Sequence, residues 1–417
     1  MIGKIKREEP KEDEQIEKSP EGKRIIYEKE DGLHHVKSFV DKYERGKEGK
    51  NRSIPMGFKR LTKYVGLRKQ VYYLIGGFTG SGKTTLVDDA FVLNPGEWFL
   101  NENRDQSLDF KIIYFSQERS KDFKIARWLS RKIFLETQEI VPIGHILGWD
   151  GVPNIHEQEL IDRYLPFINT FLDKIVTIHE GPTNPTGIYK KIKEFAMSRG
   201  QEEEVIVKRR DGTEYEKKIY VPNNPNEIVV IIVDTINLTK PEGEYIYEGS
   251  KKVLVKFLND KETLDKASEY LRWARDYLGY TPVPISQFNR SISNPIRLKN
   301  GDVQPQLEDF SGSSETQNDA EIVLALFDPM RYKVTDIYGY DLSKLKEGLD
   351  DKFPGSKKYR QLSVLKNSYG ADDVGVGLAY QPQVGLFCEL KYASEMTDED
   401  YKKVLDNTYF IENLTHK

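Results

Sequence analysis

Residues 71–88 read VYYLIGGFTGSGKTTLVD and contain a glycine-rich loop, Gly77-x-x-x-x-Gly82-Lys83-Thr84. The β-branched and aromatic run before the loop predicts a buried strand, and the residues after it predict the start of a helix. Glycines between a strand and a helix let successive backbone N–H groups turn around phosphate oxygens, where the helix N-terminus adds partial positive charge. The stretch therefore predicts a phosphate-binding loop.

The loop also supplies the side chains that ATP and its metal ion need. We expect Lys83 to reach the β- and γ-phosphates and Thr84 to ligate Mg²⁺. The alternative is a glycine-rich structural turn, which the flanking strand and helix disfavour. The residues expected to hold ATP are Gly77, Thr79, Gly80, Ser81, Gly82, Lys83, Thr84 and Thr85.

The composition is that of a globular chain without a global nucleic-acid signature. Of 417 residues 38% are hydrophobic, which supports a sizeable core. The net charge is −4, so any nucleic acid must be bound by a local basic patch. The single cysteine, Cys388, excludes a disulfide framework, and the aliphatic run 228–233 is too short to span a bilayer. The single cysteine fits the reducing cytoplasm, so we expect a cytoplasmic protein. The six histidines lack zinc-ligand spacing, so we expect no zinc.

The chain divides into four segments by composition. Residues 1–30 are mostly charged and predict a disordered tail, and residues 31–52 predict an amphipathic helix at 33–45 followed by a linker. Residues 53–392 alternate strand-like and helix-like runs, and residues 393–417 form an acidic C-terminal segment. The alternation is typical of an α/β domain with a mostly parallel, twisted sheet covered by helices on both faces.

Periodicity places the elements of this domain. We expect strands at 71–75, 111–116, 175–179, 228–233, 282–286, 321–327, 361–366, 375–380 and 384–389, and helices at 83–92, 121–136, 159–173, 186–198 and 262–278. Residues 205–221 predict a β-hairpin that turns at Asp211-Gly212. Polar or Gly- and Pro-rich stretches at 94–110, 139–158 and 331–358 predict insertions.

Polar side chains close four of the predicted strands. Because ligands bind outside the carboxyl ends of parallel strands, these residues are candidates for the site. Glu118 could activate the water that attacks the γ-phosphate, and Asp234, which closes the Walker B pattern IVVIIVD, could hold Mg²⁺. Gln287 could sense the γ-phosphate, and Lys366 could meet a phosphate on its own chain or on a neighbour. The alternative for each is an ordinary polar residue at a strand end.

Five motifs from 53 to 392, in family order, resemble the hexameric replicative DNA helicases of the DnaB type from bacteria and phages, which have a RecA-like ATPase core. They are SIPMGFKRLTKYVGL (53–67), FSQERS (115–120), VTIHEGPTNPTGIYKKIKEFAMSRG (176–200), PISQFNR (284–290) and LEDFSGSSETQNDAEIVLAL (307–326). The resemblance assigns the catalytic glutamate to Glu118, the sensor glutamine to Gln287 and an interface lysine to Lys366.

The resemblance also implies an assembly and a substrate. It implies a ring of six subunits with ATP and Mg²⁺ at each interface, single-stranded DNA in the channel, 5′ to 3′ unwinding, and a primase or loader as partner. The predicted helix at 33–45 matches the family's linker helix, which docks on the adjacent subunit. Because only a charged tail precedes it, we expect the family's N-terminal collar domain to be absent.

Two loops are candidate DNA contacts. The loop 290–306 carries Arg290, Arg297 and Lys299, and six copies would give a channel a positive lining. The alternative is a solvated surface loop. The resemblance assigns the family's DNA loop to Ser311, Gly312 and Ser313, where Ser311-Gly312 replace an Arg-Glu pair. DNA would then be held there by backbone N–H groups and hydroxyls.

The chain departs from the family where a neighbour's arginine should reach the nucleotide, because Ser368 stands at that position. Arg360 is the candidate substitute, since an arginine at this point contributes strongly to hydrolysis. Two other functions stay open. One is a RecA-like recombinase or other non-unwinding ATPase, and the other is a catalytically weak, nucleotide-stabilised ring or assembly protein.

Overall fold

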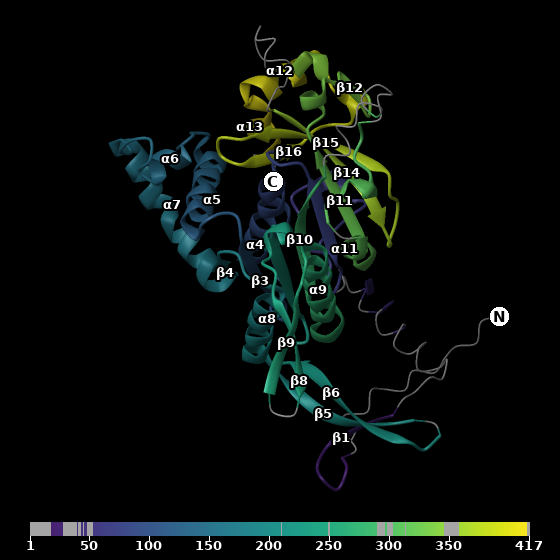
Figure 1. Ribbon diagram of the computed structural model, residues 1–417. Helices are drawn as coiled ribbons and strands as arrows, with labels where there is room; N and C mark the ends of the chain where they lie inside the picture. Colours follow the sequence, from purple (N-terminus) through teal and green to yellow (C-terminus); the bar gives the residue numbers. More distant parts are fainter. Residues whose placement is uncertain are drawn as a thin grey trace, which may run out of the picture. The chain divides into compact units, whose positions relative to one another are not determined.

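The computed structural model describes residues 18–27, 40, 43–44, 46–47, 53–209, 211–248, 251–289, 297, 303–312, 314–345 and 358–414. The chain forms two compact units, residues 1–52 with 196–225 and residues 53–195 with 226–417. Their elements are labelled in Figure 1. No helix among the described residues is long and apolar enough to cross a membrane.

The larger unit is built on a nine-stranded sheet in the order β16-β15-β14-β11-β2-β10-β7-β3-β4. Strands β11, β2, β10, β7, β3 and β4 are parallel, and β14, β15 and β16 extend the sheet in antiparallel fashion. Every predicted strand is present. The bounds are β2 (Tyr73–Gly77), β3 (Asp109–Ser116), β4 (Val176–Glu180), β7 (Glu227–Asp234), β10 (Thr281–Gln287), β11 (Ile322–Phe327), β14 (Tyr359–Asn367), β15 (Val374–Gln381) and β16 (Leu386–Glu389).

Helices cover both faces of this sheet, as predicted. Tyr73 of β2 lies in the same buried cluster as Leu86 of α3 and Phe171 of α7. On the opposite face, the Tyr72 hydroxyl lies 3.0 Å from Ser268 Oγ of α9. The helices are α2 (Lys59–Thr62), α3 (Lys83–Val87), α4 (Asn94–Asn101), α5 (Lys121–Thr137), α6 (Ile143–Ile146), α7 (Ile155–Lys174), α8 (Pro185–Arg199), α9 (Asp260–Trp273), α11 (Ser314–Asp319), α12 (Asp398–Asp406) and α13 (Thr408–Leu414).

The predicted insertion at 94–110 is wrong in its first half, because α4 continues the helix that begins at Lys83. A π-helical stretch, η1 (Asp88–Leu93), joins α3 to α4. The Asn-Pro-Gly sequence reads as a loop signal, yet Pro95 lies inside the continuous helix, directly after its π-helical stretch. Gly96 is required by packing, since a Cβ there would lie 2.4 Å from the Phe171 ring. Tertiary contact therefore overrides the local loop signal.

The larger unit also carries a β-hairpin that its sequence does not predict, β8 (Gly243–Glu248) paired with β9 (Lys251–Phe257). The predicted insertion at 331–358 contains two short paired strands, β12 (Asp336–Ile337) and β13 (Tyr340–Asp341). Helices α12 and α13 of the acidic C-terminal segment bury Tyr401, Val404 and Phe410.

The smaller unit contains a three-stranded sheet. Strands β5 (Gly200–Lys208) and β6 (Glu214–Pro222) form the predicted hairpin, and β1 (Arg24–Tyr27) pairs with β5 in parallel. Strand β1 lies within the segment predicted to be disordered, where Ile25 and Ile26 interrupt the charged sequence. Of the predicted helix at 33–45, only Val40, Tyr43 and Glu44 are described and helical, and the rest lies outside the described residues.

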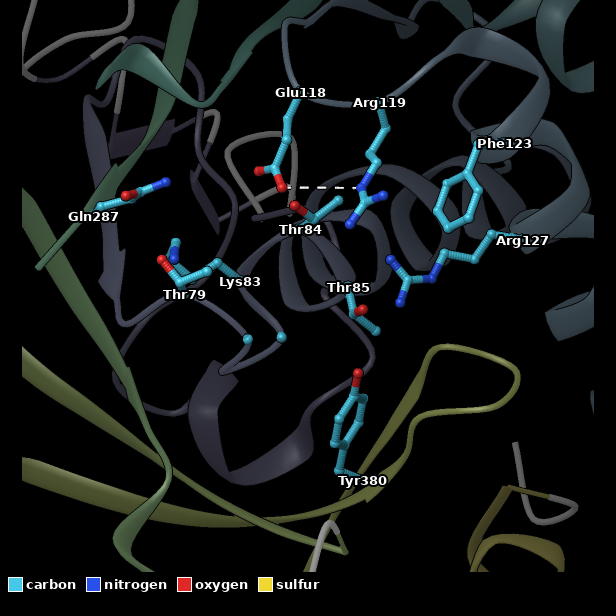
Figure 2. Close-up of a pocket in the computed structure, with 12 residues that line it drawn as sticks. Thr79, Lys83, Thr84, Thr85, Glu118, Arg119, Phe123, Arg127, Gln287 and Tyr380 are labelled. Carbon is cyan, nitrogen blue, oxygen red and sulfur yellow. Dashed lines mark ion pairs between the residues drawn. The ribbon is translucent and has the colours of Figure 1, made fainter. Parts of the chain in front are cut away.

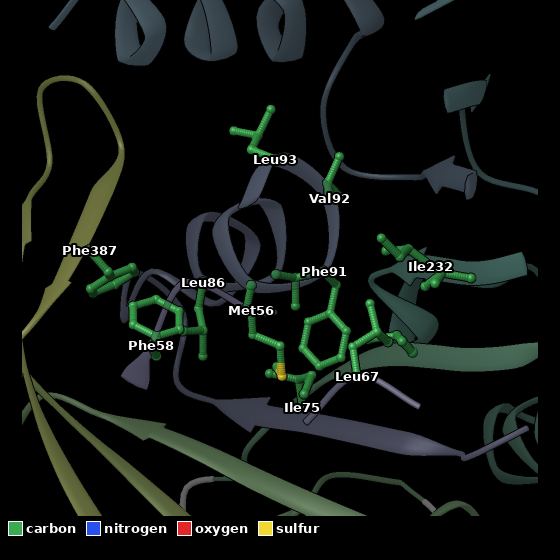
Figure 3. Close-up of a cluster of buried hydrophobic side chains, with 14 of the residues drawn as sticks. Met56, Phe58, Leu67, Ile75, Leu86, Phe91, Val92, Leu93, Ile232 and Phe387 are labelled. Carbon is green, nitrogen blue, oxygen red and sulfur yellow. The ribbon is translucent and has the colours of Figure 1, made fainter. Parts of the chain in front are cut away.

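The helix after the glycine-rich loop is the centre of the main core. Figure 3 shows Leu86 and Phe91 of this helix beside Met56 and Phe58 of the entry segment and Ile75 of the sheet. All five side chains are at most 2% exposed. Burying a side chain of this size contributes about 1.5–3 kcal/mol, so this packing fixes the helix start against the sheet.

A buried ion pair ties the same helix to its neighbours. Arg131 Nε of α5 lies 2.5 Å from Asp89 Oδ1 of η1, and both side chains are almost fully buried. The other oxygen, Asp89 Oδ2, accepts the Phe387 N–H of β16 at 2.8 Å. Asp89 therefore joins the loop's helix to α5 and to the antiparallel edge of the sheet.

We expect Arg131→Met to lower the free energy of unfolding by about 3–5 kcal/mol, because it leaves the Asp89 carboxylate buried without its cation. Urea denaturation followed by tryptophan fluorescence measures the change. The matched control is Arg163→Met on the exposed face of α7, which should change stability by less than about 0.5 kcal/mol. Equal effects of the two substitutions would contradict the assignment.

Candidate nucleotide-binding site

The glycine-rich loop runs from the end of β2 at Gly77 to the start of α3 at Lys83. Gly80 and Gly82 have φ of 82° and 101°, values that side chains disfavour. Two buried hydroxyls of the loop, Ser81 Oγ and Thr85 Oγ1, have no hydrogen-bond partner in the described part of the chain. Buried polar atoms are almost always satisfied, so these hydroxyls fit a phosphate group.

Lys83 lies in the loop with its amine turned toward the backbone. Its Nζ donates to the Phe78 carbonyl at 3.0 Å, and the residue is 9% exposed. Burial lowers the pKa of the Lys83 amine to about 8, although the charges of Asp234 and Glu118 act in the opposite direction. Phosphate oxygens would favour the charged form of this amine.

Asp234 and Thr84 form the candidate metal centre. Thr84 Oγ1 donates to Asp234 Oδ1 at 3.0 Å, and the Asp234 side chain is 1% exposed. A hydroxyl and one carboxylate, together with phosphate oxygens and water, are the ligands that Mg²⁺ takes at nucleotide sites. The residues therefore fit Mg²⁺.

The second oxygen of Asp234 faces the protein interior. Lys124 Nζ lies 3.1 Å from Asp234 Oδ2, and the Tyr114 hydroxyl lies 3.1 Å from the same atom. Burial raises the pKa of the Tyr114 phenol well above its usual value, so the phenol keeps its proton. The aspartate therefore has one oxygen toward the loop and one toward buried donors.

Strand register brings Glu118 and Gln287 to the same edge. Ser116 of β3 is opposite Asp234 of β7, and Gln287 of β10 is opposite Gly77 of β2. Glu118 lies two residues beyond the end of β3, and Figure 2 shows its carboxylate over the loop, near Thr84. The hollow is about 180 Å³, and Figure 2 shows its lining residues: Thr79, Gly80, Gly82, Lys83, Thr84, Thr85, Glu118, Arg119, Phe123, Arg127, Gln287 and Tyr380.

Four of these lining residues are not predicted from the sequence. Arg119 Nε lies 3.9 Å from Glu118 Oε1, and Phe123 and Arg127 follow on the first turns of α5. Tyr380 comes from β15 and stacks on Phe387 with ring centroids 4.4 Å apart. The only available signal was that α5 begins just after a strand end, which puts its first turns beside the loop.

Lys366 and Arg360 do not lie in the hollow. Lys366 Nζ donates to the carbonyls of Gln317 and Asn318, at the end of α11. Arg360 is 3% exposed, donates to the Ser81 carbonyl at 2.9 Å and lies 3.3 Å from Asp328. A side chain buried in this way cannot reach a neighbouring subunit, so the idea that Arg360 replaces the missing arginine is wrong. Its hydrogen bond to the Ser81 carbonyl instead stabilises the glycine-rich loop of its own chain.

Of the predicted DNA-contacting residues, Ser311 is bonded to Gln287, which lines the candidate nucleotide hollow, and Gly312 lies against Leu264 of α9. The Ser311 N–H donates to the Gln287 carbonyl at 2.9 Å. Arg297 Nη1 lies 2.5 Å from Oδ1 of the buried Asp309, so it has a partner within its own chain, and its DNA contact stays a prediction. Arg290, Lys299 and Ser313 lie outside the described residues.

No family model and no curated protein matches the chain. Solved structures, in contrast, do match the chain. One that is described as an ATPase domain matches with a TM-score of 0.59 and 16% identity over 87% of this chain and 100% of that chain. A DnaB-like replicative helicase, described with its interactions with primase, matches with the same score and identity over 87% and 69%. These neighbours confirm the predicted α/β fold, a mostly parallel sheet covered by helices on both faces.

We expect nucleotide binding at about pH 8.5 to take up a proton, because the phosphates should raise the lowered pKa of Lys83. Affinity for ADP should fall as pH rises through about 8, since the protonated amine is the binding form. Isothermal titration in two buffers of different ionisation enthalpy measures the uptake. Lys83→Arg, which stays charged, should bind without uptake. Wild-type binding without proton exchange would show that Lys83 is already charged.

Proposed function

We propose that this protein is an ATP-dependent DNA helicase that moves along single-stranded DNA as a ring. One observation carries the proposal: Asp234 and Gln287 end two neighbouring strands, Glu118 lies just beyond a third, and all three strand ends lie at the loop of Lys83 and Thr84. Several unrelated reactions use a phosphate-binding loop, but a water-activating carboxylate and a γ-phosphate sensor beside it suit hydrolysis coupled to motion.

The residues divide the hydrolytic work. Lys83 and the loop N–H groups bind the β- and γ-phosphates, and Thr84 and Asp234 hold Mg²⁺, which neutralises phosphate charge when bound. Glu118 accepts a proton from the attacking water, while Tyr380 offers a ring for the nucleoside. Arg119 and Arg127 add positive charge from the same subunit, where Ser368 leaves a neighbour without its expected arginine.

The contact between Gln287 and the loop at Ser311 is the path from hydrolysis to motion. The Phe288 N–H donates to the Gly77 carbonyl at 3.1 Å, and the Phe288 and Phe310 rings pack 4.9 Å apart. A change at the γ-phosphate that moves Gln287 must therefore move the loop that begins at Phe310. We propose that this loop, with Ser311, Gly312 and Ser313, holds the DNA backbone, with Arg290 and Lys299 adding charge.

We propose a ring of six copies in which the helix at 33–45 docks on the next copy. Within residues 149–155 of the larger unit, three apolar side chains are strongly exposed: Trp149, Val152 and Ile155, at 66%, 85% and 78%. Exposed apolar side chains of this kind suit a partner's amphipathic helix. A primase or loader is the proposed further partner, and Lys366 is proposed to act where two copies meet.

A catalytically weak ring is the second candidate. It is favoured by the burial of Arg360, which removes the substitute for the arginine that Ser368 replaces. Nucleotide would then stabilise the assembly with little turnover.

Wild-type protein should hydrolyse ATP faster with single-stranded DNA and should unwind a forked duplex, whereas Lys83→Ala should do neither because it loses its phosphate contact. Turnover with and without DNA and strand release on the fork are the measurements. Absence of DNA-stimulated hydrolysis would refute the helicase. Stimulated hydrolysis without unwinding would favour a non-unwinding ATPase, and ring formation with nucleotide but no turnover would favour the weak ring.

Glu118→Gln should reduce kcat by about 10²–10⁴-fold and leave ADP affinity unchanged, because the amide keeps the shape of the side chain and cannot take the proton. Steady-state turnover and ADP titration measure the two quantities. The exposed Glu159→Gln on α7 is the matched control. A kcat within about twofold of wild type would remove Glu118 from the water-activating role.

A further inference from the structure

Lys124 is a fully buried lysine directly behind the candidate metal centre. Its side chain is 1% exposed, and its Nζ lies 3.1 Å from Asp234 Oδ2, 2.6 Å from the Tyr114 hydroxyl and 3.7 Å from Asp88 Oδ1. The Tyr114 hydroxyl lies 3.0 Å from Asp88 Oδ1. Four polar groups from four elements therefore meet in one buried cluster.

The buried cluster connects the elements whose relative positions determine whether the site can hydrolyse ATP. Asp234 closes β7, Tyr114 belongs to β3, and Asp88 begins the π-helical stretch after the loop's helix. Lys124 lies in the first turns of α5, the helix that directly follows Glu118. A single ammonium group thus holds α5 against the metal-binding aspartate.

The segment that carries Glu118 is tied to Asp234 from its other side as well. The Gln117 N–H donates to the Asp234 carbonyl at 2.8 Å, and Ser116 Oγ donates to the Arg119 carbonyl at 2.6 Å. Glu118 itself is not buried, and among the described residues its one ion pair is with Arg119. Its position over the loop is therefore set by the tethers before and after it.

Stability alone gives little reason for a lysine at this position. Removing an ammonium group from water costs several kcal/mol, and a buried ion pair often contributes no more than apolar side chains of similar volume. Apolar side chains in place of Lys124 and Asp88 together would fill the space between α5, β3 and η1 without that cost. The positive charge of Lys124 is therefore better explained by its contact with the Asp234 carboxylate.

We propose that Lys124 is a positioning residue for ATP hydrolysis. It fixes Asp234 Oδ2 so that Oδ1 faces Thr84, and it anchors α5 so that Glu118 stays over the γ-phosphate side of the loop. Lys124 acts through Asp234 and Glu118 and does not touch the nucleotide. The proposal rests on the proposed hydrolytic function of the same site.

The test compares Lys124→Met with Lys121→Met, the same substitution at an exposed position of the same helix. We expect Lys124→Met to lower kcat by about 10–100-fold, the loss typical of removing a group that orients metal ligands, with KM for ATP within about threefold. Lys121→Met should match wild type. A loss of kcat equal in the two variants, or absent from both, would overturn the proposal.

A binding measurement keeps the test independent of turnover. We expect Lys124→Met to bind ADP in EDTA as wild type does, and to lose about 10–100-fold in affinity for ADP with Mg²⁺ and aluminium fluoride, which imitates the transition state. Equal losses in both conditions would mark a merely structural role and overturn the proposal. If wild type proves not to hydrolyse ATP, the proposed function fails, while this comparison still decides the role of Lys124.

The double variant Asp88→Asn/Lys124→Met covers the case in which the single variant does not fold. It removes one buried charge of each sign, so the net charge of the cluster is unchanged while the tether to Asp234 is lost. We expect it to fold and to show the same selective loss of metal-dependent affinity. Wild-type affinity in this variant would overturn the proposal.

Discussion

The buried carboxylate of Asp234 is the constraint on which the site depends. Its Oδ1 accepts from Thr84, its Oδ2 lies by Lys124 and Tyr114, and its carbonyl accepts from Gln117. An ionised carboxylate without partners in the interior costs several kcal/mol, so these partners cannot be given up singly. The phosphate loop, two strands and the helix after Glu118 are held together for this electrostatic reason.

The antiparallel edge of the sheet completes the phosphate loop from the other side. Arg360 of β14 binds the Ser81 carbonyl, and a Cβ on Gly82 would lie 3.0 Å from the Phe387 ring of β16. Tyr380 of β15 stacks on that ring and lines the nucleotide hollow. Strands far along the chain thus shape the loop. This explains why an arginine that looks available in the sequence is consumed inside its own subunit.

Much of the fold and part of the site could be predicted from the sequence, because they follow from residues that are close together in the chain. A short run of β-branched, aliphatic or aromatic residues marks each central strand, and a polar residue after such a run marks Glu118, Asp234 and Gln287. The sequence signal was wrong where the packing of side chains determines the structure. Pro95-Gly96 lie in a helix because Phe171 needs the space, and Lys124, on a helical face otherwise read as core, points at a carboxylate from another strand.

The sequence by itself determined the glycine-rich loop between a strand and a helix, the mostly parallel sheet and the residues at the strand ends, since each follows from the order of neighbouring residues and from hydrophobic period. Tertiary structure alone decided which charges pair. Lys124 pairs with Asp234, Arg360 donates to the Ser81 carbonyl, and Arg297 pairs with Asp309. Each contact joins residues from separate elements. Pairing in the interior depends on distances of a few ångströms, and only the packed chain sets those distances.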